Sequence, residues 1–288
     1  MKMLIKRNLI LFFRDKTSVF FSMLASLITI LLFILFLADL MVEAIGNDTP
    51  HASIEDVRLI VTGLVLSGTV AVATVSSCLN ASARLVIDKE DVAKDFFVSP
   101  ISRSSLMFGY VIASGLIGLI MSGLTLVVTV IYLVLSGSSI PLLTDLVLLL
   151  LTLILGVLSG NSMMFLISCF VKSRNAYSSL GTIVGTLIGF LTGVYIPIGQ
   201  LPGGIAWIVR LFPTSHVASM FRQILAGSAL DSLGAPAAAI AEINEFMGVT
   251  FTFGTFTTNY LFSATLLLVT SIIFYIIGLH LMKKQSFQ

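Results

Sequence analysis

Few side chains in this sequence are spaced for covalent or metal chemistry. The two cysteines, Cys78 and Cys169, and the three histidines form no metal-ligand spacing. The sequence contains no G-x-x-x-x-G-K-[ST] phosphate loop, no H-E-x-x-H and no G-x-S-x-G motif. We therefore expect this chain to hold no catalytic residue, metal or cofactor, and both cysteines to be small buried apolar side chains.

One charged connection, Arg84–Arg103, has the pattern of a short amphipathic helix. Its core reads Asp88-Lys-Glu-Asp-Val-Ala-Lys-Asp-Phe-Phe97, and Pro100 stops the helix. The apolar residues fall loosely on one helical face and most charged residues on the others. This pattern predicts a helix over about 86–98 that lies on the inner membrane face and presents charge to a soluble partner. The alternative is a solvated connection with no partner.

The N-terminal segment is basic and amphipathic. Five of its first sixteen residues are Lys or Arg, interspersed with Leu, Ile and Phe. The stretch Leu4–Phe13 is a second candidate for contact with the partner, and simple anchoring at the membrane interface is the alternative. The apolar run that follows, from Val19 to Ala38, is long enough to cross a bilayer, and Asp39-Leu40-Met41 is a poor cleavage site. We therefore expect a retained first span rather than a signal peptide.

Four glycines recur at every fourth position of a later apolar segment. Residues four apart share one helical face, so these glycines predict a groove along the helix. In lipid, helices associate through such close backbone approach. The packing partner is either another helix of this chain or a second chain. The predicted packing residues are Gly181, Gly185, Gly189 and Gly193.

The elements that carry these features are membrane spans. The chain has 288 residues, of which 57% are hydrophobic and 10% charged, and this composition excludes an ordinary soluble domain. A bilayer core about 30 Å thick requires about 20 apolar residues per crossing. We predict a single all-α transmembrane domain over 1–288 with six spans at about 17–40, 58–79, 105–135, 145–171, 176–196 and 259–282.

The distribution of basic residues predicts the orientation. Of the sixteen Lys and Arg residues, thirteen fall in the N-terminal segment, the second and fourth connections and the C-terminal tail. The other side keeps Arg58, Arg210 and Arg222. By the positive-inside rule both termini are cytoplasmic, which agrees with an even number of crossings.

The outer region, 197–258, does not read as a seventh span. A crossing through Ile205–Leu225 would place Arg210, Pro213 and His216 in lipid, which offers freed polar groups no partner. We predict instead a pair of short helices that re-enter the outer side, followed by one external helix between Pro236 and Gly248.

Charge is absent from the middle of every predicted span. An ion-driven transporter usually carries ionisable residues inside its spans, so coupling to an ion gradient lacks a carrier here. The sequence also offers no soluble stretch with room for a nucleotide-binding domain.

Taken together, the chain resembles an ABC-2 type transporter permease along its whole length. The resemblance rests on the basic amphipathic start, on Phe97-Val-Ser-Pro-Ile-Ser-Arg103, and on the stretch after the fifth span. That stretch reads Gly193-Val-Tyr-Ile-Pro-Ile-Gly-Gln-Leu-Pro202, then Leu211-Phe-Pro-Thr-Ser-His216 and Phe221-Arg222.

The resemblance implies a six-span fold, two permease chains that meet, and one ATP-binding subunit docked on each. It implies re-entrant pieces at Gln200–Val209 and Thr214–Leu225. The implied contacts with the ATP-binding subunit are Asp88, Lys89, Glu90, Asp91, Lys94, Phe96 and Phe97. The second and fifth spans of this family line a shared pathway, which nominates Leu66, Val70, Thr74, Ser77, Thr182, Thr186, Phe190 and Tyr195.

We therefore predict a multi-pass protein of the bacterial cell membrane that exports a drug, an antimicrobial peptide or a lipid-like molecule. It would work as a homodimer or heterodimer, with ATP and Mg held by the separate ATPase subunit. The alternatives are a non-transport scaffold or sensor and an ion-driven secondary transporter. No nucleic-acid partner is expected, because the net charge is only +2.

Overall fold

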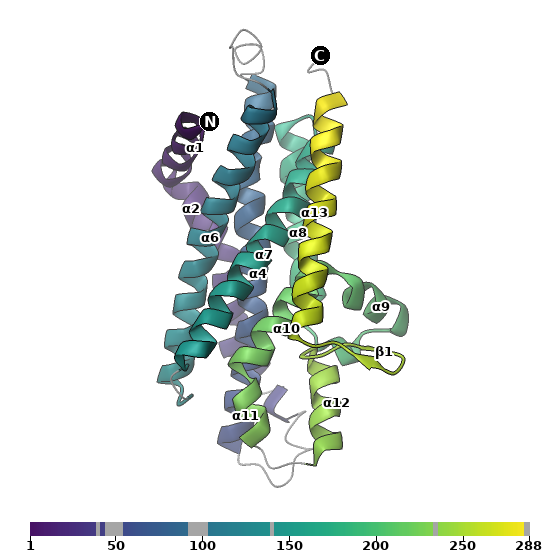
Figure 1. The fold of residues 1–288 in the computed structure, drawn as a ribbon. Helices are drawn as coiled ribbons and strands as arrows, with labels where there is room; N and C mark the ends of the chain where they lie inside the picture. The colour runs from purple at the N-terminus through teal and green to yellow at the C-terminus, as the bar shows by residue number, and fades with distance from the viewer. Residues whose placement is uncertain (39–40, 44–53, 92–102, 139–140, 233–235, 285–288) are drawn as a thin grey trace.

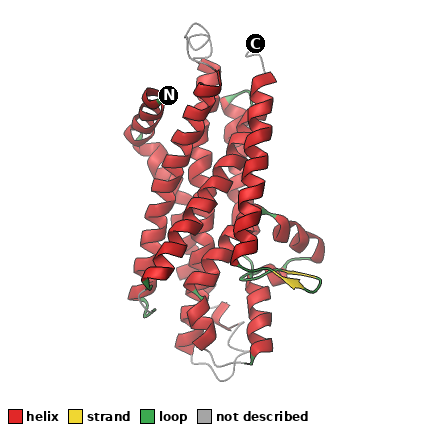
Figure 2. Ribbon diagram, viewed as in Figure 1, coloured by secondary structure: helices red, strands yellow, loops and turns green. Residues whose placement is uncertain are grey.

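The computed structural model describes residues 1–38, 41–43, 54–91, 103–138, 141–232 and 236–284, and most of them lie in helices (Figure 1, Figure 2). The long helices are α2 (Lys16–Leu32), α4 (Ile54–Asp91), α6 (Arg103–Leu135), α7 (Leu143–Phe170), α8 (Arg174–Leu191) and α13 (Tyr260–Lys284). The shorter helices are α1 (Lys2–Arg14), the π-helix η1 (Phe33–Leu37), the 3-10 helix η2 (Ile198–Gln200), α9 (Gly203–Leu211), α10 (Pro213–Leu225), α11 (Gly227–Ser232) and α12 (Ala237–Met247).

Helix α4 runs through the middle of the bundle (Figure 1). Its most apolar stretch is 94% buried, and it packs against α2, α6, α7, α8 and α10. At Gly160 of α7, a Cβ atom would lie 3.1 Å from the carbonyl oxygen of Thr74, so the backbones of α7 and α4 are in direct contact. Such close approach stabilises helix pairs in lipid, where dispersion contacts replace the hydrophobic effect.

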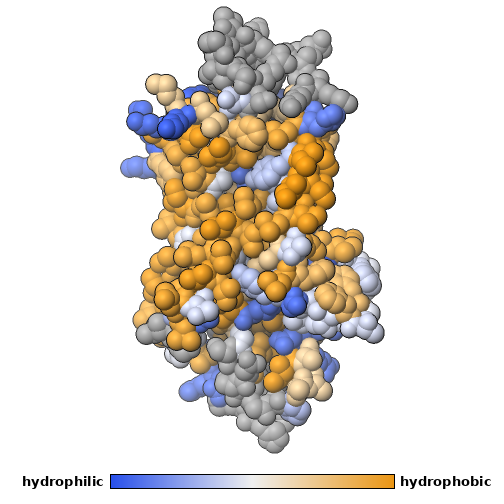
Figure 3. All heavy atoms as spheres, in the orientation of Figure 1, coloured by the Kyte–Doolittle hydropathy of each residue, from blue (hydrophilic) through white to orange (hydrophobic). Residues whose placement is uncertain are grey.

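Within the described residues, four helices are long and apolar enough to cross a membrane. They are α4, α6, α7 and α13, and a fifth crossing results if the bent pair α1–α2 is counted as one span. Figure 3 shows apolar residues over the middle of the molecule and hydrophilic residues toward both ends. The chain is therefore a multi-pass helical membrane protein, as predicted, whereas six spans remain a prediction.

The two remaining predicted spans differ from the others in length or composition. Helix α2 ends at Leu32, where the π-helix η1 begins. Helix α8, at the place of the predicted span 176–196, has 18 residues and begins with Arg174 and Asn175. These polar residues and the serines that follow leave α8 without the long apolar stretch that the four other helices have.

Helices α1 and α2 meet at a sharp elbow. They bend by 78°, so that α1 turns away from the direction of the spans. Asp15 Oδ1 accepts hydrogen bonds from the backbone N–H groups of Thr17 at 3.0 Å and Ser18 at 3.2 Å. The Asp15 side chain therefore caps the start of α2 and fixes the elbow. The predicted amphipathic stretch Leu4–Phe13 lies within α1.

The region after α8 contains short helices and a small hairpin. Helices α9 and α10 occupy the places of the predicted re-entrant pieces, and Pro213 begins α10. Helix α12 ends at Gly248, whose φ of 69° is the left-handed conformation that glycine adopts freely. The antiparallel strands β1 (Thr252–Phe253) and β2 (Phe256–Thr257) follow. The sequence predicted only helices in the outer region, and this small hairpin is a departure from that prediction. Gly254, with a φ of 65°, makes this turn possible.

Arg222 of α10 is fully buried among backbone carbonyl groups. Its Nε donates to Leu64 O of α4 at 3.1 Å, and its Nη1 donates to Gly248 O at 3.3 Å. Its Nη2 donates to Thr192 O at 2.7 Å and to Gly193 O at 3.2 Å. One side chain therefore joins α10 to α4 and to the segments that follow α8 and α12.

The position of these carbonyl groups explains how a cation is tolerated in the interior. Thr192 and Gly193 follow the last turn of α8, and Gly248 follows the last turn of α12. Carbonyl groups at helix C-termini lack intrahelical partners and carry the negative end of the helix dipole. Burial lowers the pKa of Arg222 to about 10, so the guanidinium remains protonated at neutral pH.

We predict that Arg222→Met lowers the free energy of unfolding by about 3–5 kcal/mol, because it leaves buried carbonyl oxygens without donors. The measurement is thermal unfolding of the purified chain in detergent. The control is Arg210→Met, since Arg210 is half-buried and pairs with the more exposed Glu245. That variant should lose only about 1 kcal/mol. Equal losses in both variants would contradict the role assigned to Arg222.

Candidate functional site

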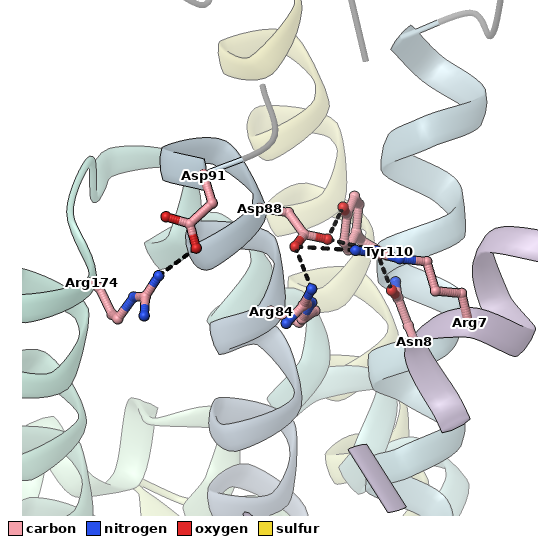
Figure 4. A network of polar contacts seen from close by, with 7 residues as sticks. All are labelled: Arg7, Asn8, Arg84, Asp88, Asp91, Tyr110 and Arg174. Carbon is pink, nitrogen blue, oxygen red and sulfur yellow. Dashed lines mark hydrogen bonds and ion pairs between the residues drawn. The ribbon is translucent and has the colours of Figure 1, made fainter. Parts of the chain in front are cut away.

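The charged end of α4 is held by a network around Asp88 (Figure 4). Asp88 is only 2% exposed. Its carboxylate pairs with Arg7 of α1 at 2.7 Å and with Arg84, one turn earlier in α4, at 2.8 Å. The hydroxyl of Tyr110 on α6 donates to the same carboxylate at 2.5 Å. Asp88 therefore ties α1 and α6 to the end of α4.

The next three residues bind the other side of the bundle. Lys89 Nζ donates to Ser168 O of α7 at 2.8 Å. Glu90 accepts a hydrogen bond from the backbone N–H of Arg174 at 3.0 Å, and Asp91 pairs with the guanidinium of the same arginine at 2.5 Å. Glu90, Asp91 and Arg174 are exposed, so this part of the network presents charge at the surface.

The arrangement makes the end of α4 a connecting point for four helices. A displacement applied there reaches α1, α6, α7 and α8 through hydrogen bonds and ion pairs. Residues 86–91, predicted to begin a separate helix over 86–98, continue α4 without a break. The Arg84–Asp88 pair, spaced by four, stabilises this continuation. Lys94, Phe96 and Phe97 lie outside the described residues.

A cavity of about 560 Å³ lies between α2, α4 and α8, near the same end of α4. From α4 it is lined by Ser76 and Asn80, and from α8 by Ser178 and Thr182. Phe21 of α2 adds an aromatic side chain. The cavity therefore combines hydroxyl and amide groups with apolar surface, which suits an amphiphilic molecule.

The pathway residues predicted on α4 lie inside the bundle of this chain. Leu66, Val70 and Thr74 have exposed fractions of 0%, and Ser77 of 1%. The Thr74 hydroxyl donates to Ala71 O of its own helix. None of the four lines the cavity, which instead receives Ser76 and Asn80 from the adjacent faces of α4.

The pathway residues predicted on α8 lie at the surface. Thr182, Thr186 and Phe190 are exposed, and Tyr195 is half-buried, with its ring edge-on to Phe190. Among them, only Thr182 lines the cavity. The structure of the single chain therefore does not bring the two predicted sets together, and their shared pathway remains a prediction about the dimer.

The four glycines of the predicted packing face have different surroundings. Gly181 and Gly185 line the cavity, and no neighbouring atom lies within 4 Å of a Cβ placed on Gly185. A Cβ on Gly189 would overlap the ring of Tyr195. Gly193 has a φ of 67° and ends the helix beside Arg222. Within this chain, the positive φ requires glycine at Gly193, a larger residue at Gly189 would have to displace the Tyr195 ring, and packing of the other two stays a prediction.

Several residues of the network were not predicted from the sequence. Arg7 and Arg174 were noted only as members of basic segments, and Tyr110 has no local signal because it lies in an apolar span. His216, on the buried face of α10, contacts Ser263 of α13 at 3.0 Å and Arg210 O at 2.9 Å. The one signal that marks His216 and Arg222 is that they are ionisable residues between two apolar spans.

Comparisons with known proteins indicate the family of this chain. The sequence profile of the family described as ABC-2 family transporter protein matches residues 47–280. Nodulation protein J of Rhizobium meliloti (strain 1021) is 30% identical over 73 residues, a stretch that covers 25% of this chain and 28% of that protein. The match to this relative therefore spans about a quarter of its length.

We predict that Asp88→Asn lowers the free energy of unfolding by about 1–3 kcal/mol, because two arginines lose their shared carboxylate. The measurement is thermal unfolding of the purified chain. Asp91→Asn is the matched control, since its partner Arg174 is exposed and such pairs contribute about 0–1 kcal/mol. The prediction fails if the two substitutions have the same effect.

Proposed function

As a member of the ABC-2 family of transporter proteins, the chain is the membrane subunit of an ABC transporter, and we propose that it exports a hydrophobic or amphiphilic cargo. The resemblance drawn from its motifs is thereby confirmed at the level of the family. Membership favours ATP-driven transport over a scaffold, a sensor or a secondary transporter. The charge-free middle of the spans agrees, because it offers an ion gradient no carrier.

The observation that carries the proposal is the network at the end of α4. Four helices are bonded there, while Glu90, Asp91 and Arg174 remain exposed. A separate ATP-binding subunit that docks on this charged surface would move the bundle as a rigid body. In this proposal the ATPase holds ATP and Mg, and Lys94, Phe96 and Phe97 extend the contact surface.

The cavity between α2, α4 and α8 is the proposed entry site for the cargo. Its hydroxyl and amide groups would bind the polar part of an amphiphile, and Phe21 and Leu79 its apolar part. The closing of two permease chains on ATP binding would turn this site toward the outer side. Hydrolysis would reset it.

The second permease chain is proposed to cover the exposed face of α8. This helix packs mainly against α4 and lies at the edge of the bundle. Its surface residues Thr182, Thr186 and Phe190 would face the equivalent helix of the partner. The predicted residues of α4 would join the pathway only in a state in which α4 separates from its neighbours.

We predict that the double reversal Glu90→Lys, Asp91→Lys weakens binding of the ATP-binding subunit by roughly tenfold or more, about 1.4 kcal/mol. The measurement is co-purification of the ATPase with the affinity-tagged chain from a detergent extract of membranes. The control, Glu55→Lys with Glu242→Lys, reverses two exposed charges elsewhere in the chain and should bind normally. Unchanged ATPase binding in the first variant would remove the proposed contact surface.

We predict that Gly185→Phe reduces transport by roughly tenfold, because the new ring enters the cavity and occupies the space meant for cargo. The backbone tolerates it, since no atom lies within 4 Å of the added Cβ. The measurement is ATP-driven uptake of an amphiphilic dye into inside-out vesicles. Ile183→Phe is the control, as Ile183 is exposed and does not line the cavity. Dye uptake that survives Gly185→Phe would contradict this entry site.

A further inference from the structure

We propose that a second cavity, which we call the elbow pocket, binds the phosphate group of an anionic phospholipid. The elbow pocket has a volume of about 120 Å³ and lies between α1, α2, α4 and α6. Its polar lining consists mainly of Asn8, Asp15, Asn80, Arg84, Tyr110 and Ser114. The inference requires only that the chain lies in a membrane, and it is independent of how an ATPase docks.

The orientation of Asn8 leaves a buried donor in the elbow pocket. Asn8 is 3% exposed, and its Oδ1 accepts a hydrogen bond from Arg7 Nη1 at 3.1 Å. A guanidinium can only donate, so this contact fixes the amide with its oxygen toward Arg7. The buried Nδ2 has no partner in the protein. A buried amide N–H without an acceptor is costly, so the pocket requires an acceptor.

Arg84 supplies a second unpaired donor at the same place. Its Nη2 pairs with Asp88, whereas its Nε is buried and has no partner in the protein. Asn8 and Arg84 both line the elbow pocket, and a buried N–H group of each lacks an acceptor, which favours an anionic oxygen ligand over a cation. Phosphate oxygens accept several charge-assisted hydrogen bonds at once.

The two carboxylates at the elbow pocket are already engaged. Asp15 accepts from the N–H groups of Thr17 and Ser18 and from the Ser18 hydroxyl. Asp88 is shared by Arg7, Arg84 and Tyr110. Around them, α1 and the first residue of α2 contribute further exposed cations that favour an anion over water: Lys2, Lys6, Arg14 and Lys16.

The setting favours a lipid over free phosphate. Leu11, Phe12 and Ile117 line the apolar part of the elbow pocket, where the glycerol and first methylene groups of a lipid would lie. The neighbouring α2 exposes Phe20 and Phe21. Hydrophilic residues of α1 adjoin the apolar surface of the bundle in Figure 3, as expected at the level of lipid headgroups. The volume of the elbow pocket, about 120 Å³, is several times that needed for one water molecule, so a larger group fits there.

The test measures lipid binding to the purified full-length chain by native mass spectrometry. Dioleoyl phosphatidylglycerol should bind about tenfold more tightly than dioleoyl phosphatidylcholine, whose choline cation would face the arginines. Asn8→Asp keeps the oxygen that accepts from Arg7 but replaces the free donor with a carboxylate, so it should weaken phosphatidylglycerol binding about tenfold. Lys6→Gln removes an exposed charge from the same helix and should change binding by less than about twofold.

A second variant keeps the test decisive if Asn8→Asp does not fold. Arg84→Lys retains the charge beside Asp88 but loses the Nε donor, and it should also weaken phosphatidylglycerol binding. Equal binding of the two lipids by the wild-type chain would overturn the proposal. So would equal loss in Lys6→Gln and Asn8→Asp, since that result indicates surface electrostatics alone. Displacement of phosphatidylglycerol by about 10 mM inorganic phosphate would assign the pocket to a free anion instead of a lipid.

Discussion

The interior of a bilayer offers no hydrogen-bond partners, so every charged group inside the helix bundle must find its partners within the chain. The protein solves this problem in two ways. Arg222 is surrounded by main-chain oxygens at two helix C-termini and on α4. Asp88 is neutralised by side chains from α1 and α4 and bonded to Tyr110 of α6. In both cases the charge is retained because its partners come from several helices, which it thereby holds together.

These two charge sites fix α4 at separate points along its length. Arg222 bonds to Leu64, in the first third of α4, and Asp88 lies about seven turns later, near the end of the helix. Between them α4 carries no ionised side chain until Arg84, and its neighbours approach closely at small residues such as Gly160. A helix held at two well-separated points and packed along its length moves as one body. That property is what the proposed coupling between a docked ATPase and the outer region requires.

The sequence predicted the parts of this structure that follow from hydropathy and from local signals. The long apolar helices, the break at Pro213 between two short helices and the end of α12 at Gly248 belong to this group, whereas the elbow near Asp15 was not predicted. Burial of Arg222 could not be predicted in the same way, because its partners are carbonyl groups and main-chain atoms have no sequence signature. Nor could periodicity show that Leu66 and Thr74 face other helices, since α4 is surrounded on all sides and has no lipid-facing stripe.

The position of α8 leaves one wall of the candidate site at the surface of this chain. Its exposed hydroxyl groups do not themselves demand a polar neighbour, because Thr182 and Thr186 each donate to a carbonyl of their own helix. Their exposure is therefore compatible with lipid, with cargo or with a partner helix. The cavity favours cargo at the N-terminal part of this face. It is bounded by α2, α4 and α8, and Gly185 leaves open space there rather than a packed side chain. Helix α8 is held to its neighbours at both ends, by Arg174 at its start and by the bonds from Arg222 to Thr192 O and Gly193 O after its last turn. A tilt of α8 against α4 would therefore have to break hydrogen bonds or ion pairs at one end of the helix.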